Sequence, residues 1–437
     1  MVTPSTLATV HLWDRLVGAV SWDPKRDVAA FEFNPAFLAE GLIDLAPITM
    51  PAESSEGVVY AFSALNPTTF RKLPGVLADA LPDKFGEVLI DTWLAQQGRP
   101  AGSMNPVERL CYTGNRGMGA LEFKPVMAAD DMNASLQVDI NALVNLAGQA
   151  IARYQNLEAT LDGAQDANAL QDILRVGTSA GGARAKAIVA IDDKGEVRSG
   201  QVAAPPGFTH YLLKFDGVTD LELGRPQEFT RIEYAYYLMA QAAGIHIMPS
   251  RLLEEGGRAH FITERFDRQR GRKIAMQSLC GMAHFDFNQA GAYGYEQAFA
   301  VMRKLVLPKE DAVELYRRML FNVLARNQDD HTKNISFVMD SQGPDAYAWR
   351  LSPAYDVTYA YNPAGSWTSS HQMTIAGKRD GFTREELIAV GRSISLRNPA
   401  EVIDEVSQSI GDWMVCAERA GLSEEMALSI MRTYRKI

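Results

Sequence analysis

The sequence predicts an α+β fold, in which α/β segments occupy the first 270 residues and helices dominate the remainder. Three observations support this prediction. Short apolar runs typical of strands alternate with helical stretches in the first part, and apolar residues recur at helical spacing after about Gln277. The length of 437 residues also exceeds what a single hydrophobic core usually supports. We therefore expect three parts, over residues 1–127, 128–270 and 271–437.

The first part contains both strand and helix signals. The apolar runs Val10–Trp13 and Leu16–Val20 flank Asp14-Arg15 and predict a β-hairpin that turns at these two residues. Residues 73–97 carry apolar side chains at helical spacing and predict one helix. A glycine-rich turn then leads into a strand over Gly114–Phe123. This part is expected to end near Lys124-Pro125.

The second part begins with a helical stretch over residues 139–174. Strands are expected at Ala187–Ile191, His210–Phe215 and Ala259–Glu264, because each is a short apolar run bounded by turn residues. A helix over Gln227–Ala243 separates the last two strands.

In the third part the clearest helix is Lys309–Arg326, with Pro308 just before its start. A polar loop follows, and the apolar run Ile335–Met339 then predicts a strand. Ser341–Asp345 is a turn that leads into a second strand.

Composition narrows the classes of function. Hydrophobic residues are 47% and charged residues 22%, as in ordinary globular proteins. The net charge of -10 argues against autonomous binding of DNA or RNA, which needs a basic surface. The three cysteines, Cys111, Cys280 and Cys416, are widely separated, which argues against a disulfide framework and a structural zinc site.

Targeting signals are not apparent. Residues 1–16 lack a basic segment followed by a long apolar one, and no stretch approaches 18 uninterrupted apolar residues. We expect a cytoplasmic protein that neither spans a membrane nor carries a secretion signal.

Four motifs could carry chemistry, and the first is the glycine-rich segment Gly177–Lys186. Glycines let backbone amides approach phosphate oxygens, and Lys186 adds positive charge. The segment lacks the G-K-[ST] ending of a Walker loop. Taken alone, it is as well explained by an ordinary surface loop.

The second motif is Lys214 within the apolar strand Tyr211–Phe215. A lysine on a buried strand is costly unless it has a partner. In kinases a strand lysine holds the nucleotide phosphates and pairs with a helix glutamate, and Glu233 in the next helix is the expected partner. The alternative is an edge strand that leaves Lys214 in solvent.

The third motif is the loop Asn327–Asn334, directly after the strong helix. Asp329 and Asn334 have the D-x-x-x-x-N spacing of the protein-kinase catalytic loop. In that reading the aspartate accepts the substrate hydroxyl proton and the asparagine carbonyl binds magnesium. The alternative, a solvated connection, fits less well because the loop joins two elements expected to be buried.

The fourth motif is Leu351–Val357, which places Asp356 at the end of a strand. A hairpin between Asn334 and Asp356 would bring both side chains together. Oxygen ligands in that arrangement suit a magnesium ion carried by a nucleotide. Standing alone, Asp356 would be better explained as a turn or capping residue.

These motifs, in this order, resemble those of the HipA kinases of bacterial toxin–antitoxin pairs. The resemblance rests on four segments: Ser179–Lys186, Glu264–Arg268, Asp329–Asn334 and Leu351–Asp356. In the first part, Val17–Val20 and Leu110–Ala120 are similar to the N-terminal subdomain of that family.

The resemblance implies a protein-kinase-like two-lobed fold and an ATP- and magnesium-dependent serine/threonine kinase. Asp329 would be the catalytic base, Asn334 and Asp356 the magnesium ligands, and Ser179 an autophosphorylation site. The implied ATP-binding set comprises Ser179, Ala180, Gly181, Gly182, Lys186, Lys214, Glu233, His331, Lys333 and Tyr355, with Glu264 and Phe266 as the adenine hinge.

Family membership would also imply partners. They are a small helix-turn-helix antitoxin of the HipB type, through which the pair contacts operator DNA, and a protein substrate with a Ser or Thr acceptor. An aminoacyl-tRNA synthetase is one candidate for that substrate. No membrane partner is expected.

This chain departs from the family pattern at two places. The best-known member has Gln-Glu-Lys where this chain has Arg184-Ala-Lys186, and Asp330 adds a carboxylate beside Asp329. Two other functions remain open at the sequence level. One is a small-molecule phosphotransferase, and the other is a catalytically silent kinase fold that binds a DNA-bound repressor. The presence of Lys214, Asp329, Asn334 and Asp356 together favours a working kinase over the silent form.

Overall fold

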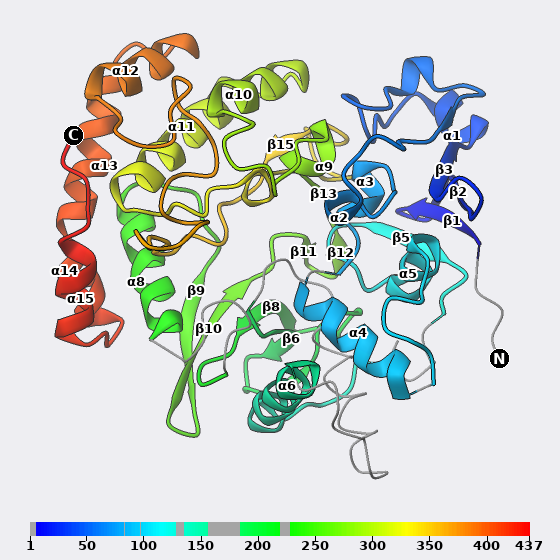
Figure 1. Ribbon diagram of the computed structural model, residues 1–437, viewed down its shortest axis with the longest axis horizontal. Helices are drawn as coiled ribbons and strands as arrows, with labels where there is room; N and C mark the ends of the chain where they lie inside the picture. The colour runs from blue at the N-terminus through cyan, green and yellow to red at the C-terminus, as the bar shows by residue number, and fades with distance from the viewer. Residues whose placement is uncertain (1–5, 83, 97, 128–134, 156–183, 219–227) are drawn as a thin grey trace. The chain divides into compact units, whose positions relative to one another are not determined.

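A computed structural model describes residues 6–82, 84–96, 98–127, 135–155, 184–218 and 228–437. Contacts within the chain define two compact units (Figure 1). Unit 1 comprises Met1–Leu45, Met50–Thr230 and Arg251–Met276, and unit 2 comprises Ala46–Thr49, Arg231–Ser250 and Gln277–Ile437. Among the described residues, no helix has both the length and the apolar content needed to cross a membrane.

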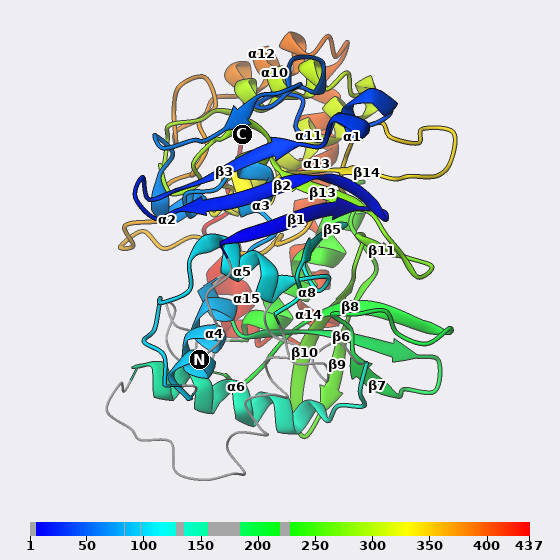
Figure 2. The same cartoon turned by 90° about the vertical axis from the view of Figure 1, so that its right-hand side faces the viewer.

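The first sheet of unit 1 has the strand order β4-β3-β2-β1-β5. Its strands are β1 (Leu7–Leu12), β2 (Arg15–Asp23), β3 (Val28–Phe33), β4 (Val59–Tyr60) and β5 (Leu121–Lys124). The predicted hairpin is confirmed, since β1 and β2 pair antiparallel. Its turn is Trp13-Asp14, with positive φ at both positions, and not the predicted Asp14-Arg15, because Arg15 already pairs with Leu12. Figure 2 shows β1, β2 and β3 side by side, and helix α5 (Pro106–Thr113) packs against β1, β2 and β5.

The single helix predicted over residues 73–97 is wrong. The structure has two helices there, α3 (Gly75–Ala78) and α4 (Lys84–Gln96). Pro82 lies between them, and a proline inside a helix removes a backbone donor and clashes with the preceding turn. The other helical elements of this region are α1 (Pro35–Glu40), η1 (Ala52–Ser54), α2 (Pro67–Phe70) and α6 (Ile140–Gln155).

The second sheet of unit 1 has the order β7-β6-β8-β10-β9. Its strands are β6 (Lys186–Asp192), β7 (Val197–Ser199), β8 (Phe208–Lys214), β9 (Ser250–Glu255) and β10 (Arg258–Glu264). One face is covered by α4 and α6, whose Phe85, Leu89, Leu143 and Val144 pack with Ala187, Val189 and Leu213 of the sheet. Side chains alternate along a strand, so Lys186 and Lys214 lie on the opposite face.

Unit 2 is mainly helical, as the sequence predicted. Its long helix α11 (Lys309–Leu324) packs against α10 (Tyr295–Lys304), α12 (Arg384–Ser393) and α13 (Pro399–Gly411). The remaining helices are α8 (Phe229–Ala242), α9 (Leu279–Ala283), η3 (Thr332–Asn334), α14 (Trp413–Arg419) and α15 (Glu424–Met431). The short strands of unit 2 are β14 (Ser336–Met339) and β15 (Arg350–Leu351). Unit 1 contains the short strands β11 (Arg268–Gln269) and β12 (Arg272–Lys273), and the residues of β13 (Ala275–Ser278) are divided between the two units.

The strands β14 and β15 form the predicted hairpin after the polar loop. Phe337 pairs with Leu351 and Val338 with Arg350 in antiparallel register. The loop before β14 and the segment after β15 therefore leave the hairpin at the same end. This arrangement positions the candidate site.

Candidate active site

The polar loop begins where α11 ends. Arg326 adopts a left-handed conformation (φ 57°) that turns the chain out of the helix. The N–H of Gln328 donates to Ala360 O across 3.0 Å, and the N–H of Ala360 donates to Arg326 O across 3.1 Å. The start of the loop is thereby fixed to the segment that follows β15.

Asp329 carries the accessible carboxylate of this loop, with a side chain that is 38% exposed. The indole Nε1–H of Trp367 donates to its Oδ1 across 2.6 Å. His331 Nε2 lies 3.8 Å from the same oxygen. Within the described residues, Oδ2 has no hydrogen-bond donor from a side chain, so one oxygen of the carboxylate remains to accept a proton.

The surroundings of Asp329 favour its action as a base. Burial raises the pKa of this carboxyl above its usual range, and the nearby charges of Asp356 and Asp330 raise it further. His331 and the N–H of Trp367 oppose the shift without cancelling it. A raised pKa makes the carboxylate a stronger proton acceptor near neutral pH.

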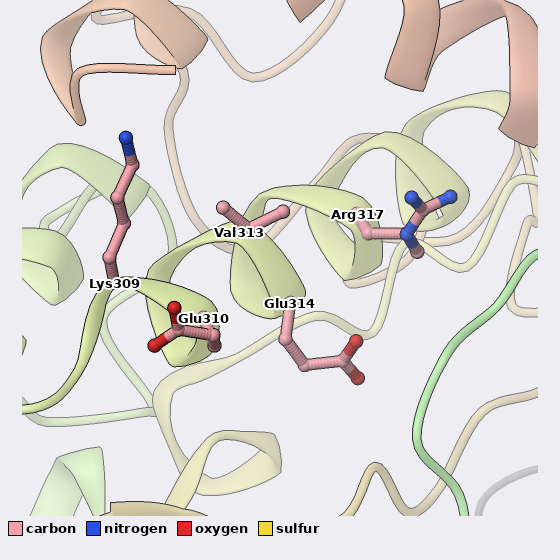
Figure 3. A pocket seen from close by; sticks show the side chains of 5 residues that line it. All are labelled: Lys309, Glu310, Val313, Glu314 and Arg317. Carbon is pink, nitrogen blue, oxygen red and sulfur yellow. The ribbon is translucent and has the colours of Figure 1, made fainter. Parts of the chain in front are cut away.

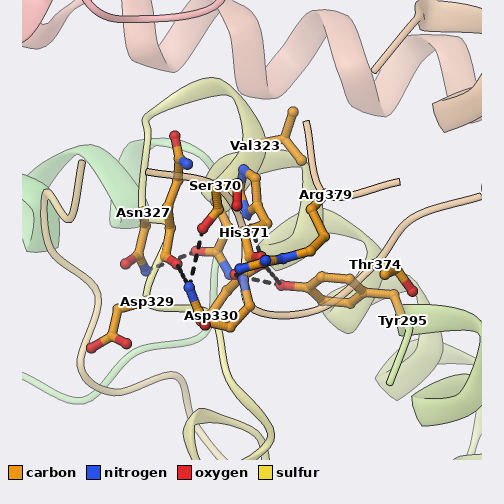
Figure 4. Close-up of polar contacts among 12 residues, drawn as sticks. Tyr295, Val323, Asn327, Asp329, Asp330, Ser370, His371, Thr374 and Arg379 are labelled. Carbon is orange, nitrogen blue, oxygen red and sulfur yellow. Dashed lines mark hydrogen bonds and ion pairs between the residues drawn. The ribbon is translucent and has the colours of Figure 1, made fainter. Parts of the chain in front are cut away.

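Asp330 is in a different environment, although it is the next residue. It is only 3% exposed. Its Oδ2 accepts from Tyr295 Oη (3.0 Å) and His371 Nδ1 (2.8 Å), and its Oδ1 accepts from the N–H of Gln372 (2.8 Å). Figure 4 shows this cluster, from which the side chain of Asp329 points away. With three donors around it, Asp330 has a structural role, which favours Asp329 as the base.

Asn334 ends the short helix η3, which packs against α9. Its Nδ2 donates to the backbone oxygen of Asp329 across 2.8 Å. That contact sets the orientation of the amide and leaves Oδ1, the atom that can bind a cation, on the other side. Asp356 has a positive φ of 56°, a conformation that Asp tolerates better than most residues.

Asn334 and Asp356 line one cavity of about 30 Å³, together with Asn327, Asp330 and Tyr355. This volume holds one or two water molecules and is too small for a nucleotide. The two side chains offer one amide oxygen and one carboxylate. Magnesium commonly takes such ligands and completes its shell with water and phosphate oxygens.

A site made by the protein alone is not apparent. Among the described residues, no group of three or more His, Cys, Asp or Glu side chains could hold a metal ion. Asn334 and Asp356 are the candidate ligands for a magnesium ion, because each can supply one oxygen atom.

Three hydrogen bonds hold the segment before Asp356 near the loop. Tyr355 Oη bonds both Ser336 Oγ and the backbone oxygen of Lys333. Arg318 of α11 donates to Ser352 O across 2.7 Å. The segment before Asp356 is thus fixed both to η3 and to the helix that carries the loop.

In unit 1, the structure places two candidate lysines side by side. Lys186 of β6 pairs directly with Lys214 of β8, and they are 1% and 7% exposed. The alternative of a solvent-exposed Lys214 on an edge strand is wrong, because β8 lies in the middle of its sheet. As direct partners, the two lysines present their side chains on the same face of the sheet.

The segment Glu264–Arg268 runs from the last residue of β10 to the first residue of β11. Arg265 donates two hydrogen bonds to Asp267, at 2.8 and 2.7 Å. Burial alone would raise the pKa of Asp267, but the guanidinium groups of Arg265 and Arg268 hold it below its usual range.

The segment Glu264–Arg268 also contacts the glycine-rich segment 114–119. The N–H of Gly119 donates to Asp267 Oδ2 across 2.8 Å, and Arg268 donates to the carbonyls of Gly117 and Gly119. The sequence analysis named these two segments without relating them, and the structure shows that they are hydrogen-bonded to each other. Their contact fixes the backbone around Glu264 and Phe266.

The remaining predicted site residues lie as follows. Glu233 is 2% exposed and belongs to unit 2, whereas Lys214 belongs to unit 1, so their pairing stays a prediction. Lys333 Nζ lies 5.3 Å from the ring centroid of Phe287, and His331 packs on the same ring. The residues Ser179, Ala180, Gly181 and Gly182 lie outside the described residues.

A larger depression, of about 330 Å³, lies along the first turns of α11 (Figure 3). Three of its lining residues are already engaged: Lys309 bonds Ser395 O, Glu314 accepts from the N–H of His246, and Arg317 bonds Glu405. Size alone does not make it a site. The smaller cavity is lined by Asn327, Asp330 and Asn334 of the polar loop, and it is therefore the one next to the candidate chemistry.

Sequence reasoning missed Trp367, His371 and Tyr295, whose side chains contact Asp329 or Asp330. Trp367 and His371 lie in an irregular segment without helix or strand periodicity. A tryptophan within a polar stretch, Ser366–Ser369, was the available signal.

Comparison with known proteins relates the N-terminal and C-terminal parts of the chain to one family. The family model for the HipA-like C-terminal domain matches residues 178–427, and that for the HipA N-terminal domain matches residues 8–124. A solved structure of the Shewanella oneidensis MR-1 toxin–antitoxin system, HipA with HipB and its operator DNA, superposes with a TM-score of 0.66. That match has 18% identity and covers 98% of this chain and 94% of the other.

A Sinorhizobium fredii protein with the name "Putative kinase Y4mE" is 25% identical over 189 residues. The match spans 39% of this chain and 44% of that protein, which is less than half of the relative's length.

Proposed function

The chain belongs to the HipA family, and on that premise we propose that it is an ATP- and magnesium-dependent protein kinase that acts on Ser or Thr hydroxyls. One observation carries the proposal. Asp329 presents a partly exposed carboxylate of raised pKa, while Asn334 and Asp356 line a cavity at the same loop. An acceptor hydroxyl and a nucleotide phosphate would be positioned by one structural element.

In this proposal Asp329 accepts the proton of the acceptor hydroxyl, while the hydroxyl oxygen bonds to the γ-phosphorus of ATP. The bond from that phosphorus to the β,γ-bridging oxygen breaks, and ADP leaves with the electron pair. Asn334 and Asp356 would hold magnesium, which neutralises phosphate charge when bound. The chain mainly positions the reactants and stabilises the developing charge.

Lys186 and Lys214 would neutralise the phosphates of the nucleotide. Because they lie directly opposite each other on β6 and β8, both side chains can reach the same anion. Glu233 would orient Lys214, and the backbone at Glu264 and Phe266 would receive the adenine base. The turn that carries these two residues is fixed by Asp267 and its arginines, so the hinge would be formed before the ligand arrives.

Incubation of the purified chain with γ-labelled ATP and magnesium tests the proposal. Label should appear on protein, and ADP should form, in the wild type. Asp329→Asn should lower both by about two to four orders of magnitude, the range for loss of a positioned base. Labelling of a small-molecule acceptor alone, or an Asp329→Asn variant with full turnover, would contradict the proposed reaction.

The proposal extends to a partner. The structural relative is a HipA found with HipB and operator DNA, and a helix-turn-helix antitoxin of this kind is proposed for the present chain. With a net charge of -10, the chain should bind DNA weakly alone and reach operators through a basic partner. Tight, sequence-specific binding by the isolated chain in a mobility-shift assay would contradict this part.

A further inference from the structure

The segment of residues 360–372 is anchored at both ends, to the start of the polar loop and to Asp330 within it. At its start, Ala360 exchanges hydrogen bonds with the backbone of Arg326 and Gln328. At its end, the side chain of His371 and the N–H of Gln372 donate to Asp330. These anchors hold the segment beside the loop at both ends, and Trp367 lies between them.

The backbone of this segment is held from within as well. The N–H of Asn362 donates to Thr368 O (3.3 Å), and that of Gly365 donates to Asn362 O (3.0 Å). The side-chain amide of Gln372 donates to the carbonyl of Trp367 and to Ser370 O. Trp367 therefore has a fixed backbone from which its indole reaches Asp329.

We propose that Trp367 is a positioning residue for phosphoryl transfer, holding the Asp329 carboxylate in one orientation through its Nε1–H. This inference rests on the proposed function. The contact is short, at 2.6 Å, and involves a carboxylate, which places it among the stronger hydrogen bonds. His331 Nε2, at 3.8 Å from the same oxygen, is too far away to replace it.

The need for such a contact follows from the flexibility of the side chain. The terminal torsion of Asp is broad and roughly two-fold, so an unrestrained carboxylate exchanges its two oxygens. Trp367 occupies Oδ1 and leaves Oδ2 for the acceptor hydroxyl. The identity of the donor matters too, because an indole donates and has no acceptor. It fixes the base without competing for the proton that the base must take.

Trp367→Phe tests the inference, since it keeps an aromatic ring and removes the N–H. We expect kcat to fall roughly tenfold to a hundredfold, the range for a hydrogen bond to a charged group. KM for ATP and for the protein acceptor should stay within about twofold, because neither is bound through the lost contact. Ser366→Ala, an exposed neighbour in the same loop, is the matched control and should retain wild-type kcat.

A thermal unfolding midpoint close to that of the wild type would show that Trp367→Phe is folded. An unchanged kcat in that folded variant would overturn the role of Trp367 alone. A raised kcat would also overturn it, since the indole would then obstruct the base. Absence of transfer by the wild type would instead overturn the proposed function and the catalytic role of Trp367 with it.

A spectroscopic measurement decides the contact independently of turnover. The indole N–H resonance of Trp367, assigned by its loss in Trp367→Phe, should lie downfield of the other indole signals. At fixed pH it should move upfield in Asp329→Asn and stay in place in Ser366→Ala. An indole signal that does not respond to Asp329→Asn would show that the contact is absent, and the proposal would fail.

Discussion

His371 Nδ1 donates its proton to Asp330 Oδ2 across 2.8 Å, although 41 residues separate them in sequence. The tautomer follows from the other ring nitrogen. Arg435 Nη1 lies 2.7 Å from His371 Nε2, and a guanidinium can only donate, so Nε2 accepts and the proton resides on Nδ1. Arg435 in turn bonds Asp380. A chain of polar groups that runs from the exposed Asp380 to the buried Asp330 thereby fixes the loop that carries Asp329.

The first prediction separates the two adjacent aspartates. Asp330→Asn should lower the free energy of unfolding by roughly 2–4 kcal/mol, because an amide cannot accept from all three donors that surround Asp330 and leaves buried groups unpaired. Asp329→Asn should unfold like the wild type. Urea denaturation measures both. A stable Asp330→Asn variant without kinase activity, beside an active Asp329→Asn variant, would reverse the assignment.

The second prediction concerns magnesium. Asp356→Ala should weaken the binding of ATP in the presence of magnesium and leave the weaker, metal-free binding unchanged, since it removes a proposed metal ligand. Asp345→Ala is the control, an exposed carboxylate on the same hairpin. Calorimetric titration with and without magnesium measures the difference. Equal MgATP affinity in Asp356→Ala and the wild type would show that Asp356 is not a ligand.

The third prediction concerns the lysine pair of β6 and β8. ATP at a hundred times its Kd should stabilise the wild type by about 2.7 kcal/mol. Lys186→Met and Lys214→Met should each lose most of that stabilisation at the same ATP concentration. Lys194→Met, on the exposed turn after β6, should keep it. Thermal or urea unfolding with MgATP measures the effect, and full stabilisation of either variant would exclude that lysine from the phosphate site.

The fourth prediction uses His210 of β8. Burial, aided by the charge of Arg265, lowers the pKa of His210 to about 4, against the donation from its Nδ1 to Gly200 O. Its unfolded pKa is about 6.5, so the unfolded chain binds the proton first as pH falls. The contribution of neutral His210 to the free energy of unfolding is complete above about pH 6.5 and is lost as the pH falls toward 4.

The free energy of unfolding that is lost is on the order of 3 kcal/mol, because the folded and unfolded pKa values of His210 differ by roughly 2.5. Urea unfolding of the wild type and of His210→Asn between pH 4 and 7 isolates the contribution of His210. The other histidines contribute equally to the unfolding free energies of both proteins, so their effect cancels in the difference. The difference between the two unfolding free energies should shrink on acidification. A difference that is constant with pH would show that His210 is not buried in its neutral form.

The fifth prediction is that Ser179 is an autophosphorylation site, as the family resemblance implies. A phosphate there adds about -1.5 to -2 charges and would compete with ATP for loop amides and for Lys186. Peptide mass spectrometry after incubation with MgATP should find it on the wild type and not on Ser179→Ala or Asp329→Asn. Modification of Thr178 instead would move the site by one residue. Unchanged ATP affinity after phosphorylation would remove the regulatory role.

Much of the local structure could be predicted from the sequence. The hairpin of β1 and β2, the helix α11 and the hairpin of β14 and β15 were predicted because each depends on periodicity and turn residues close together in the chain. The order of Asp329, Asn334 and Asp356 was readable for the same reason. The predicted helix over residues 73–97 was wrong because periodicity outweighed the effect of Pro82.

The sequence by itself therefore determined the family, the α+β composition of the chain and the order of the candidate catalytic residues. Only the tertiary structure decided which of two adjacent aspartates is buried, since the donors to Asp330 come from Tyr295, His371 and Gln372. It also decided that Trp367 bonds Asp329 and that Lys186 lies opposite Lys214. Such contacts join residues 28 to 42 positions apart, and their partners are chosen by packing of the whole domain, which leaves no local pattern to read.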